Sequence, residues 1–201
     1  MCTAVISRQA VVSRVAIFDT RSTSVVIEIP MSVIRLASGA QLRPATEADV
    51  PAILGFICEL ADYEHLRHEV TATEEKLHAS LFGEQRYAEV ILAEVDGNAV
   101  GMALFFHNYS TFLAQPGIHL EDLYVQPAHR SLGLGKALIT RLAQLAVERN
   151  CGRLEWQVLD WNEPARQFYR ALGAQALDGW LTKRVTGDGL TQMAAQFERC
   201  L

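Results

Sequence analysis

The sequence predicts a mixed α/β fold in which one mixed sheet is covered by helices. From residue 41 onward, short apolar segments typical of strands alternate with segments of helical periodicity, in the order β-α-α-β-β-β-α-β-α-β. The chain has 201 residues, of which 50% are apolar and 20% charged, and it contains no internal repeat or low-complexity linker after residue 41. These values predict one ordinary globular core without a second domain.

The first predicted strand begins near residue 41 and is followed directly by a helix. Thr46 and Asp49 stand at the spacing of a capping box, which marks the start of that helix. Its apolar residues recur on one face: Val50, Ile53, Leu54, Ile57 and Leu60. A second, shorter helix is indicated by a cap, an acidic first turn and two spaced leucines: Thr73, Glu74, Glu75, Leu77 and Leu81.

The centre of the chain predicts three strands and a helix. Residues 88–107 are two apolar segments joined at Asp96, Gly97 and Asn98, which are typical hairpin residues. Residues 118–125 are a third strand. The following helix carries a stripe of four leucines: Leu134, Leu138, Leu142 and Leu145.

The C-terminal part predicts a strand, a compact helix and a last strand. The strand covers residues 153–161. The helix has Asn162 as a candidate cap, Pro164 in its first turn, where the missing N–H is harmless, and Gly173 at its end. Residues 179–185 are predicted to form the last strand.

The segment "AHRSLGLGKALITRL", residues 128–142, precedes and opens the leucine-striped helix. A P-loop would need glycine and Ser or Thr where the chain has Arg130 and Ala137, and a dinucleotide-binding loop would need a third glycine in place of Leu138. What remains is R-x-x-G-x-G between a strand and a helix. Its main-chain N–H groups would converge at the positive end of the helix dipole, so the motif is either an anion cradle or a plain turn.

The charge and cysteine patterns restrict the function. Residues 1–40 carry four Arg and two acidic residues, so the net charge of −5 leaves −7 for residues 41–201. An acidic body argues against nucleic-acid binding and permits a cationic substrate. No apolar run reaches the roughly 20 residues of a membrane-spanning helix. Four separated cysteines without C-x-x-C spacing predict reduced thiols, no metal site and a cytoplasmic location: Cys2, Cys58, Cys151 and Cys200.

Residues 1–40 are interpreted as a non-catalytic N-terminal extension, and residues 41–201 as the functional domain. Arg8 and Arg14 interrupt the apolar start, which argues against a secretory signal. The Arg and Ser content permits an organelle transit peptide. We favour an over-long start with Met31 as the working initiator.

The block "LEDLYVQPAHRSLGLGKAL" followed by "VLDWNEPARQFYRALGA" resembles the GNAT superfamily of acetyl-CoA-dependent N-acetyltransferases, within it the diamine and polyamine acetyltransferases. The likeness runs from about Leu42 to Val185. "YSTF" at 109–112 and "LDWN" at 159–162 are similar to the thialysine-type branch. The resemblance implies the GNAT fold with a central, mostly antiparallel sheet, acetyl-CoA as co-substrate, no metal and a homodimer. Ser131 stands where glycine is common in R-G-x-G-x-G.

The resemblance also implies the residues that bind acetyl-CoA. The main chain of the strand residues Leu123, Tyr124 and Val125 would hold the acetyl and pantetheine part, although they also suit a core strand. Asn162, with Pro164 beside it, matches a position near the thiol, and Tyr169 matches the tyrosine that protonates the departing thiolate; a helix cap and core packing are their structural alternatives. The matching pyrophosphate loop consists of Arg130, Ser131, Leu132, Gly133, Leu134, Gly135 and Lys136.

The acceptor side rests on carboxylates. Glu121 and Asp122 are consecutive in an otherwise apolar strand, so their side chains are expected on opposite faces and at least one must leave the core or enter a cleft. A solvated edge is the alternative. The resemblance implies that Glu121 lies beside the attacking nitrogen, and that Tyr63, Glu64 and Asp178 line the amine site together with Asp122.

The predicted function is transfer of an acetyl group from acetyl-CoA to a primary amine of a small cationic acceptor, a diamine, polyamine or thialysine-like amine. The amine attacks directly in a ternary complex, because none of the four cysteines lies in the motif block. Two alternatives remain: acetylation of another amine, such as an amino acid, an antibiotic or a protein, and a non-catalytic acyl-CoA-binding module.

Overall fold

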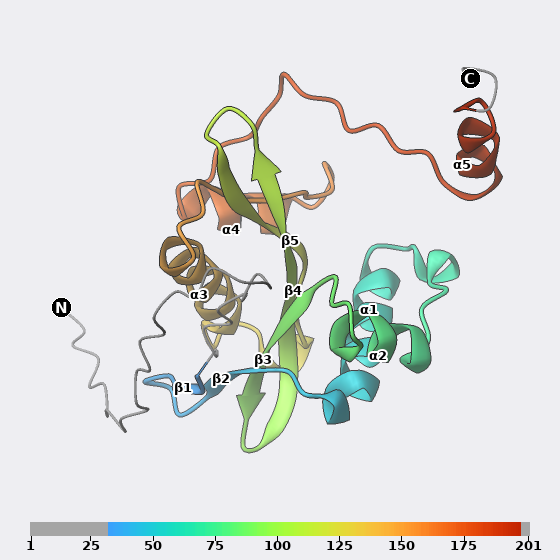
Figure 1. Ribbon diagram of the computed structural model, residues 1–201. Coiled ribbons are helices and arrows are strands. Elements are labelled where there is room, and N and C mark those ends of the chain that lie inside the picture. The colour runs from blue at the N-terminus through green and yellow to red at the C-terminus, as the bar shows by residue number, and fades with distance from the viewer. Residues whose placement is uncertain (1–31, 198–201) are drawn as a thin grey trace, which may run out of the picture. The chain divides into compact units, whose positions relative to one another are not determined.

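The computed structural model describes residues 32–197, which divide into two compact units at Gln157. The first unit contains a six-stranded sheet in the order β1 to β6, as Figure 1 shows for its central strands. All neighbouring strands are antiparallel except β5 and β6, which are parallel. The mixed, mostly antiparallel fold class is therefore confirmed. The strands are β1 (Ile34–Arg35), β2 (Gln41–Pro44), β3 (Glu89–Val95), β4 (Asn98–Ser110), β5 (Gln115–Val125) and β6 (Leu154–Trp156).

Helices cover both faces of this sheet. In Figure 1, α1 and α2 lie on one side of the central strands and α3 lies on the other. The α1 face holds an apolar cluster in which Phe56 of α1 packs on Tyr124 of β5, with ring centroids 5.9 Å apart. On the other face, the guanidinium of Arg149 at the end of α3 lies 5.8 Å from the ring centroid of Phe105. The bounds are α1 (Val50–Tyr63), α2 (Glu74–Phe82) and α3 (Leu134–Glu148).

The helix starts follow the predicted caps. Asp49 accepts hydrogen bonds at Oδ2 from the N–H of Thr46 at 2.7 Å and from its hydroxyl at 2.8 Å, which forms the capping box ahead of α1. Thr73 caps α2 by accepting a hydrogen bond from the N–H of Lys76. Both helices bury apolar residues at helical spacing, and they cover the sheet for that reason.

The hairpin and the leucine stripe are also confirmed. Asp96 and Gly97 form the two-residue turn between β3 and β4, with φ of 51° and 78° as a primed hairpin turn requires. All four leucines of the stripe are buried in α3: Leu134, Leu138, Leu142 and Leu145.

The second unit contains α4 (Glu163–Ala171) and α5 (Gly187–Ala194). The Oδ1 atom of Asn162 accepts a hydrogen bond from the N–H of Ala165 at 3.3 Å, so the predicted cap is present, and Pro164 lies in the first turn. The prediction of a last strand over residues 179–185 is wrong, because that segment forms no ladder among the described residues. A strand needs a paired neighbour as well as suitable residues. The helix α5 was not predicted.

The structure also differs from the sequence-based expectations at the end of one strand and in the N-terminal segment. Only residues 154–156 of the predicted strand 153–161 are paired, and β1 forms within the segment assigned to the N-terminal extension. Cys58 and Cys151 are free thiols, whereas Cys2, Cys200 and Met31 lie outside the described residues. Within residues 32–197, no helix has the length and apolar character to cross a membrane.

Candidate active site

A β-bulge at Glu121 interrupts the ladder between β4 and β5. Leu120 pairs with Phe105 and Asp122 pairs with Leu104, so Glu121 is the extra residue. Phe105 packs toward α3, whereas Leu104 belongs to the cluster under α1, so the bulge turns Asp122 toward the α1 face.

The prediction that Glu121 and Asp122 point to opposite faces is therefore wrong. Glu121 lies beside His119, with 3.7 Å between Oε2 and Nε2, and His119 pairs with Phe106 on the face opposite Leu120. The side chain of Asp122 lies on this same face. Because the bulge adds a residue, strict alternation along the strand fails at this point.

Three carboxylates approach one another at this face. Burial raises the pKa of Asp122 to about 6, and the negative charges of Glu121 and Glu64 add to the shift. Burial also raises the pKa of Glu64, which caps the C-terminal end of α1. Half-buried carboxylates without a matching cation are costly, so a bound cation would stabilise them.

Aromatic rings and one arginine lie next to the carboxylates. The guanidinium of Arg130 is 5.6 Å from the ring centroid of Tyr63 and 6.0 Å from that of Tyr124, and its Nε donates a hydrogen bond to the carbonyl of Val125 at 3.0 Å. The hydroxyl of Tyr124 is hydrogen-bonded to Glu59, and burial together with this bond raises the pKa of Tyr124 to about 12. Arg130 thus fixes the end of β5 to the loop that follows.

One edge of β5 is open where the bulge begins. The parallel pairing with β6 covers only Ile118–Leu120, while β4 pairs with the other edge as far as Val125. No strand among the described residues pairs with the first edge after Leu120. The main-chain N–H and C=O groups of Leu123 and its neighbours on that edge can therefore bind an extended ligand.

The glycine-rich loop lies between this strand and α3. Ser131 and Gly133 both have positive φ, 66° and 77°, which explains why glycine suits position 131. The first intrahelical hydrogen bond runs from the N–H of Ala137 to the carbonyl of Gly133, so the N–H groups of the preceding residues have no acceptor within the helix. A Cβ placed on Gly133 or Gly135 would meet no atom within 4 Å. The loop therefore offers donors and open space to an anion. Leu132 and Lys136 are exposed here, and Leu134 is buried.

The remaining predicted residues belong to the second unit. Asn162 uses its side chain as the cap of α4, and Tyr169 on the same helix is half-buried beside Phe168, with ring centroids 5.2 Å apart. Asp178 is exposed in the segment after α4. The structure thus places Arg130 beside Tyr63 and Tyr124, and Asp122 near Glu64 and Glu121. In the second unit, Asn162 and Pro164 lie at the start of α4, which also carries Tyr169.

Two residues of this region were not predicted. His119 lies beside Glu121, and Glu59 is hydrogen-bonded to Tyr124 and Gln126. The position of Glu59 one turn before Tyr63 in the sequence was a usable signal, because residues four apart share a helix face. His119 precedes Glu121 by two residues, and this spacing alone does not mark a strand residue as part of a site.

Residues 54–174 match the acetyltransferase (GNAT) family, and the match covers the bulge, the open edge of β5, the glycine-rich loop and α4. The chain belongs to this family. It is therefore an acetyltransferase, as the sequence predicted.

Curated relatives cover most of this acetyltransferase. It is 38% identical to a thialysine N-epsilon-acetyltransferase of Bos taurus, over 77% of this chain and 97% of that protein. It is 32% identical to an L-ornithine N5-acetyltransferase of Arabidopsis thaliana, over 75% of this chain and 86% of that protein. Among solved structures, an integron cassette protein from the mobile metagenome of V. cholerae is 25% identical with a TM-score of 0.66, over 77% of this chain and 97% of that one.

Proposed function

We propose that this enzyme transfers the acetyl group of acetyl-CoA to a primary amine of a small cationic acceptor, a diamine, polyamine or thialysine-like amine. The observation that carries the proposal is the group of carboxylates on the α1 face, Glu64, Glu121 and Asp122, in a member of this family. Such an acceptor carries a second charged group a few carbons from the reacting nitrogen. Acidic side chains at the site favour it by direct charge attraction.

The acetyl-CoA side of the proposal uses the strand and the loop. We assign the acetyl and pantetheine part to the main chain of Leu123, Tyr124 and Val125, supported by the open edge of β5. We assign the pyrophosphate to the loop residues, supported by their positive φ values and the open start of α3. These loop residues are Arg130, Ser131, Leu132, Gly133, Leu134, Gly135 and Lys136. Asn162 and Pro164 are assigned to the thiol region on the family resemblance.

The reaction needs a neutral amine and a protonated leaving group. An alkyl amine with a pKa of about 10.4 is neutral in only one molecule in ~2,500 at pH 7, a deficit of about 4.6 kcal/mol. We assign removal of the amine's proton to Glu121 and protonation of the thiolate to Tyr169. The other residues of the acceptor site are Tyr63, Glu64, Asp122 and Asp178. The amine then attacks the acetyl carbonyl directly, with no acetylated enzyme.

An amine panel tests the function. Purified enzyme is mixed with acetyl-CoA and each of thialysine, L-ornithine, spermidine, a short diamine, an aminoglycoside and a lysine-containing peptide. Release of free CoA is followed, and the acetylated product is identified by mass spectrometry. We expect the fastest turnover with a small acceptor of two or more positive charges. Turnover of the peptide or aminoglycoside alone would establish a different amine, and no CoA release with any amine would indicate an acyl-CoA-binding module instead.

We further propose that the enzyme works in the cytoplasm as a homodimer. The dimer rests on the family resemblance, and the location rests on the separated cysteines of the sequence. Light scattering on the eluate of a sizing column tests the dimer, and fluorescence microscopy of a C-terminal fusion of the full chain tests the location.

A further inference from the structure

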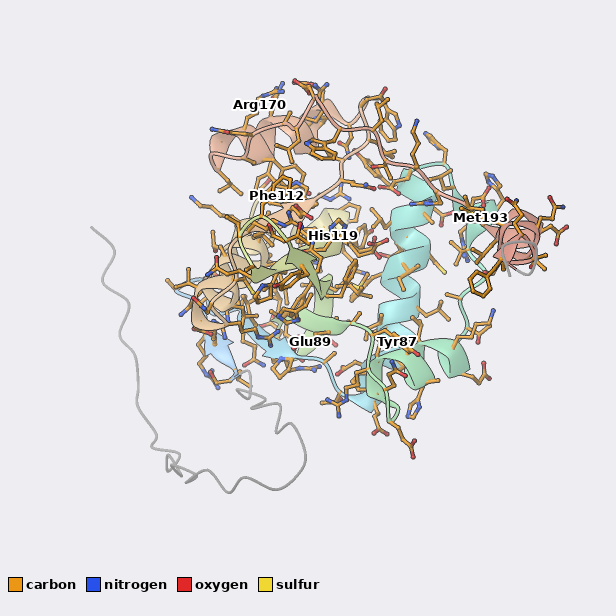
Figure 2. The ribbon with its side chains drawn as sticks, turned by 45° about the horizontal axis from the view of Figure 1, so that its top comes forward. Tyr87, Glu89, Phe112, His119, Arg170 and Met193 are labelled. Atoms are coloured by element: carbon orange, nitrogen blue, oxygen red, sulfur yellow. The ribbon has the colours of Figure 1, made fainter. Side chains whose placement is uncertain are left out.

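His119 lies in the middle of β5 two residues before Glu121 (Figure 2). Its Nε2 atom is 3.7 Å from Oε2 of Glu121, and its ring stacks on Phe106 with centroids 5.0 Å apart and an angle of 30° between the planes. The side chain of His119 is 19% exposed, against 54% for Glu121. The imidazole is therefore held in place beside the carboxylate while one part of it still reaches solvent.

The strand neighbours of His119 are carboxylates and one aromatic ring. Glu121 and Asp122 lie on the same strand, and Phe106 is its partner on β4. On β6 its partner is Glu155, whose carboxylate is engaged by Asn108 and by Nε of Arg153 at 3.1 Å. The carboxylate of Glu155 is therefore already paired, and Glu121 is the carboxylate that lies against the imidazole.

We propose that His119 accepts the acceptor's proton from Glu121, so that the two side chains form a proton relay. The proposal rests on the function proposed above and deepens it. A carboxylate alone is a weak acceptor for the proton of an alkyl ammonium, whereas an imidazole holds a proton well near neutral pH. His119 acts through Glu121 and does not touch the acceptor. The two lie together because residues two apart in a strand share a face.

The relay moves one proton in two transfers. An N–H bond of the ammonium breaks and an O–H bond forms on the carboxylate of Glu121, which leaves the amine neutral. Because 3.7 Å is too long for a direct hydrogen bond, one water bridges the two side chains: that O–H bond breaks as the water takes the proton, and the water gives one of its own protons to Nε2 of His119. The water is regenerated, and the positive charge ends on the imidazolium. The imidazolium releases the proton to solvent through its exposed part after the amine has attacked. No other atoms or electrons change partners.

Substitution of His119 separates a relay from a packing role. The full-length His119→Gln variant keeps a polar side chain of similar length but cannot be charged. We expect kcat/KM with acetyl-CoA and thialysine, or with the fastest amine of the panel, to fall by about 100-fold at neutral pH. We also expect the pH profile of kcat/KM to change shape relative to that of the wild type. His107→Gln is the matched control, because His107 lies on the neighbouring strand on the face toward Arg149. It should keep the wild-type profile.

Chemical rescue provides the second measurement. His119→Ala removes the ring, and added imidazoles should restore acetylation of the amine, with rates that rise with the basicity of the added imidazole. Melting temperatures show whether each variant is folded, and mass spectrometry shows that the amine rather than the imidazole is acetylated. Wild-type turnover with an unchanged pH profile in His119→Gln, or no rescue of a folded His119→Ala, overturns the relay and leaves the proposed function intact. A wild-type enzyme that acetylates no amine overturns both.

Discussion

Asp122 occupies the position opposite Leu104 that Glu121 would take in a regular ladder. This shift by one residue places Asp122 on the face covered by α1, where Glu64 and Glu121 are its charged neighbours. An apolar residue there would pack better with Leu104 and Tyr124. A carboxylate kept in such a place at a cost in stability is typical of a functional site.

Asp122→Asn is expected to stabilise the free enzyme at neutral pH. The pKa of Asp122 is raised from 3.8 to about 6 in the folded state, so the group is neutral in both states below about 3.8 and has no effect there. As the pH rises from 3.8 through 6, the free energy of unfolding of the wild-type protein falls by about 2 kcal/mol, after allowance for solvent screening. Asn at this position avoids that loss. Urea unfolding of both proteins at about pH 3.5 and about pH 7.5 measures this. A gain of the same size at both values would show that the charge is not the cause.

The same substitution should weaken binding of the acceptor amine. Asn cannot pair with a cation, so the KM for a cationic amine should rise while the KM for acetyl-CoA stays unchanged. Steady-state kinetics at about pH 7.5 separate the two constants. Equal changes in both would indicate a general distortion of β5.

Asp49→Asn is expected to destabilise the protein, and only above acidic pH. Asp49 accepts two hydrogen bonds from Arg43, at 2.7 and 2.8 Å, and this arginine lowers the pKa of Asp49 from 3.8 to about 2. Its contribution of about 2 kcal/mol is therefore present above 3.8 and is lost as the pH falls through 2. Urea unfolding across this range measures it. Asp62→Asn is the control, because that carboxylate is 61% exposed and 3.6 Å from Arg67, and little change is expected.

Local signals were sufficient for most of the helices. The capping box of Thr46 and Asp49 and the leucine stripe of α3 depend on residues three or four apart, and the structure contains both. The bulge at Glu121 depends instead on the register between two strands, which no local pattern contains. Residues 179–185 have strand-forming side chains but no ladder among the described residues, so propensity alone misled the prediction.

The candidate site follows the same division. The sequence supplied Glu64, Glu121 and Asp122 as residue types, and the family motif connected them. The common face of Glu121 and Asp122 and the raised pKa of Asp122 follow from the bulge. A register shift of this kind depends on how two strands pair, so no pattern within one strand reveals it.

Gly135→Val is expected to weaken binding of acetyl-CoA without unfolding the protein. A side chain at Gly135 meets no atom within 4 Å and needs no positive φ, so the free chain tolerates it. The added methyl groups would occupy the space beside the first turn of α3 where we place the pyrophosphate. The KM for acetyl-CoA should rise about tenfold or more, roughly 1.4 kcal/mol, with an unchanged KM for the amine.

Gly55 serves as the matched control for Gly135, because it separates crowding of the cofactor from a change in helix stability. Gly55 of α1 likewise has open space at its Cβ position and no positive φ. Gly55→Val should therefore leave the KM for acetyl-CoA at the wild-type value. Gly133 is unsuitable for this comparison, because its φ of 77° strains any substitution and mixes stability with binding. Similar rises in KM for Gly55→Val and Gly135→Val would remove the loop assignment.

Tyr169→Phe tests the assignment of the acid that protonates the thiolate. A phenol and a thiol have reference pKa values of about 10 and 8.5, so the transfer is uphill by about 2 kcal/mol, which a positioned side chain can supply at little cost. The substitution removes one oxygen from α4 and leaves the ring that contacts Phe168, and the melting temperatures of both proteins show whether folding is unaffected. We expect kcat to fall by about 100-fold with little change in either KM.

Phe168→Leu, next to Tyr169 on α4, controls for packing and should leave kcat within a few-fold of wild type. The measurement must be made where chemistry limits turnover, which pre-steady-state CoA release without a burst establishes. Full kcat for Tyr169→Phe under that condition would mean that water or another group protonates the thiolate, and Tyr169 would then be a packing residue of α4.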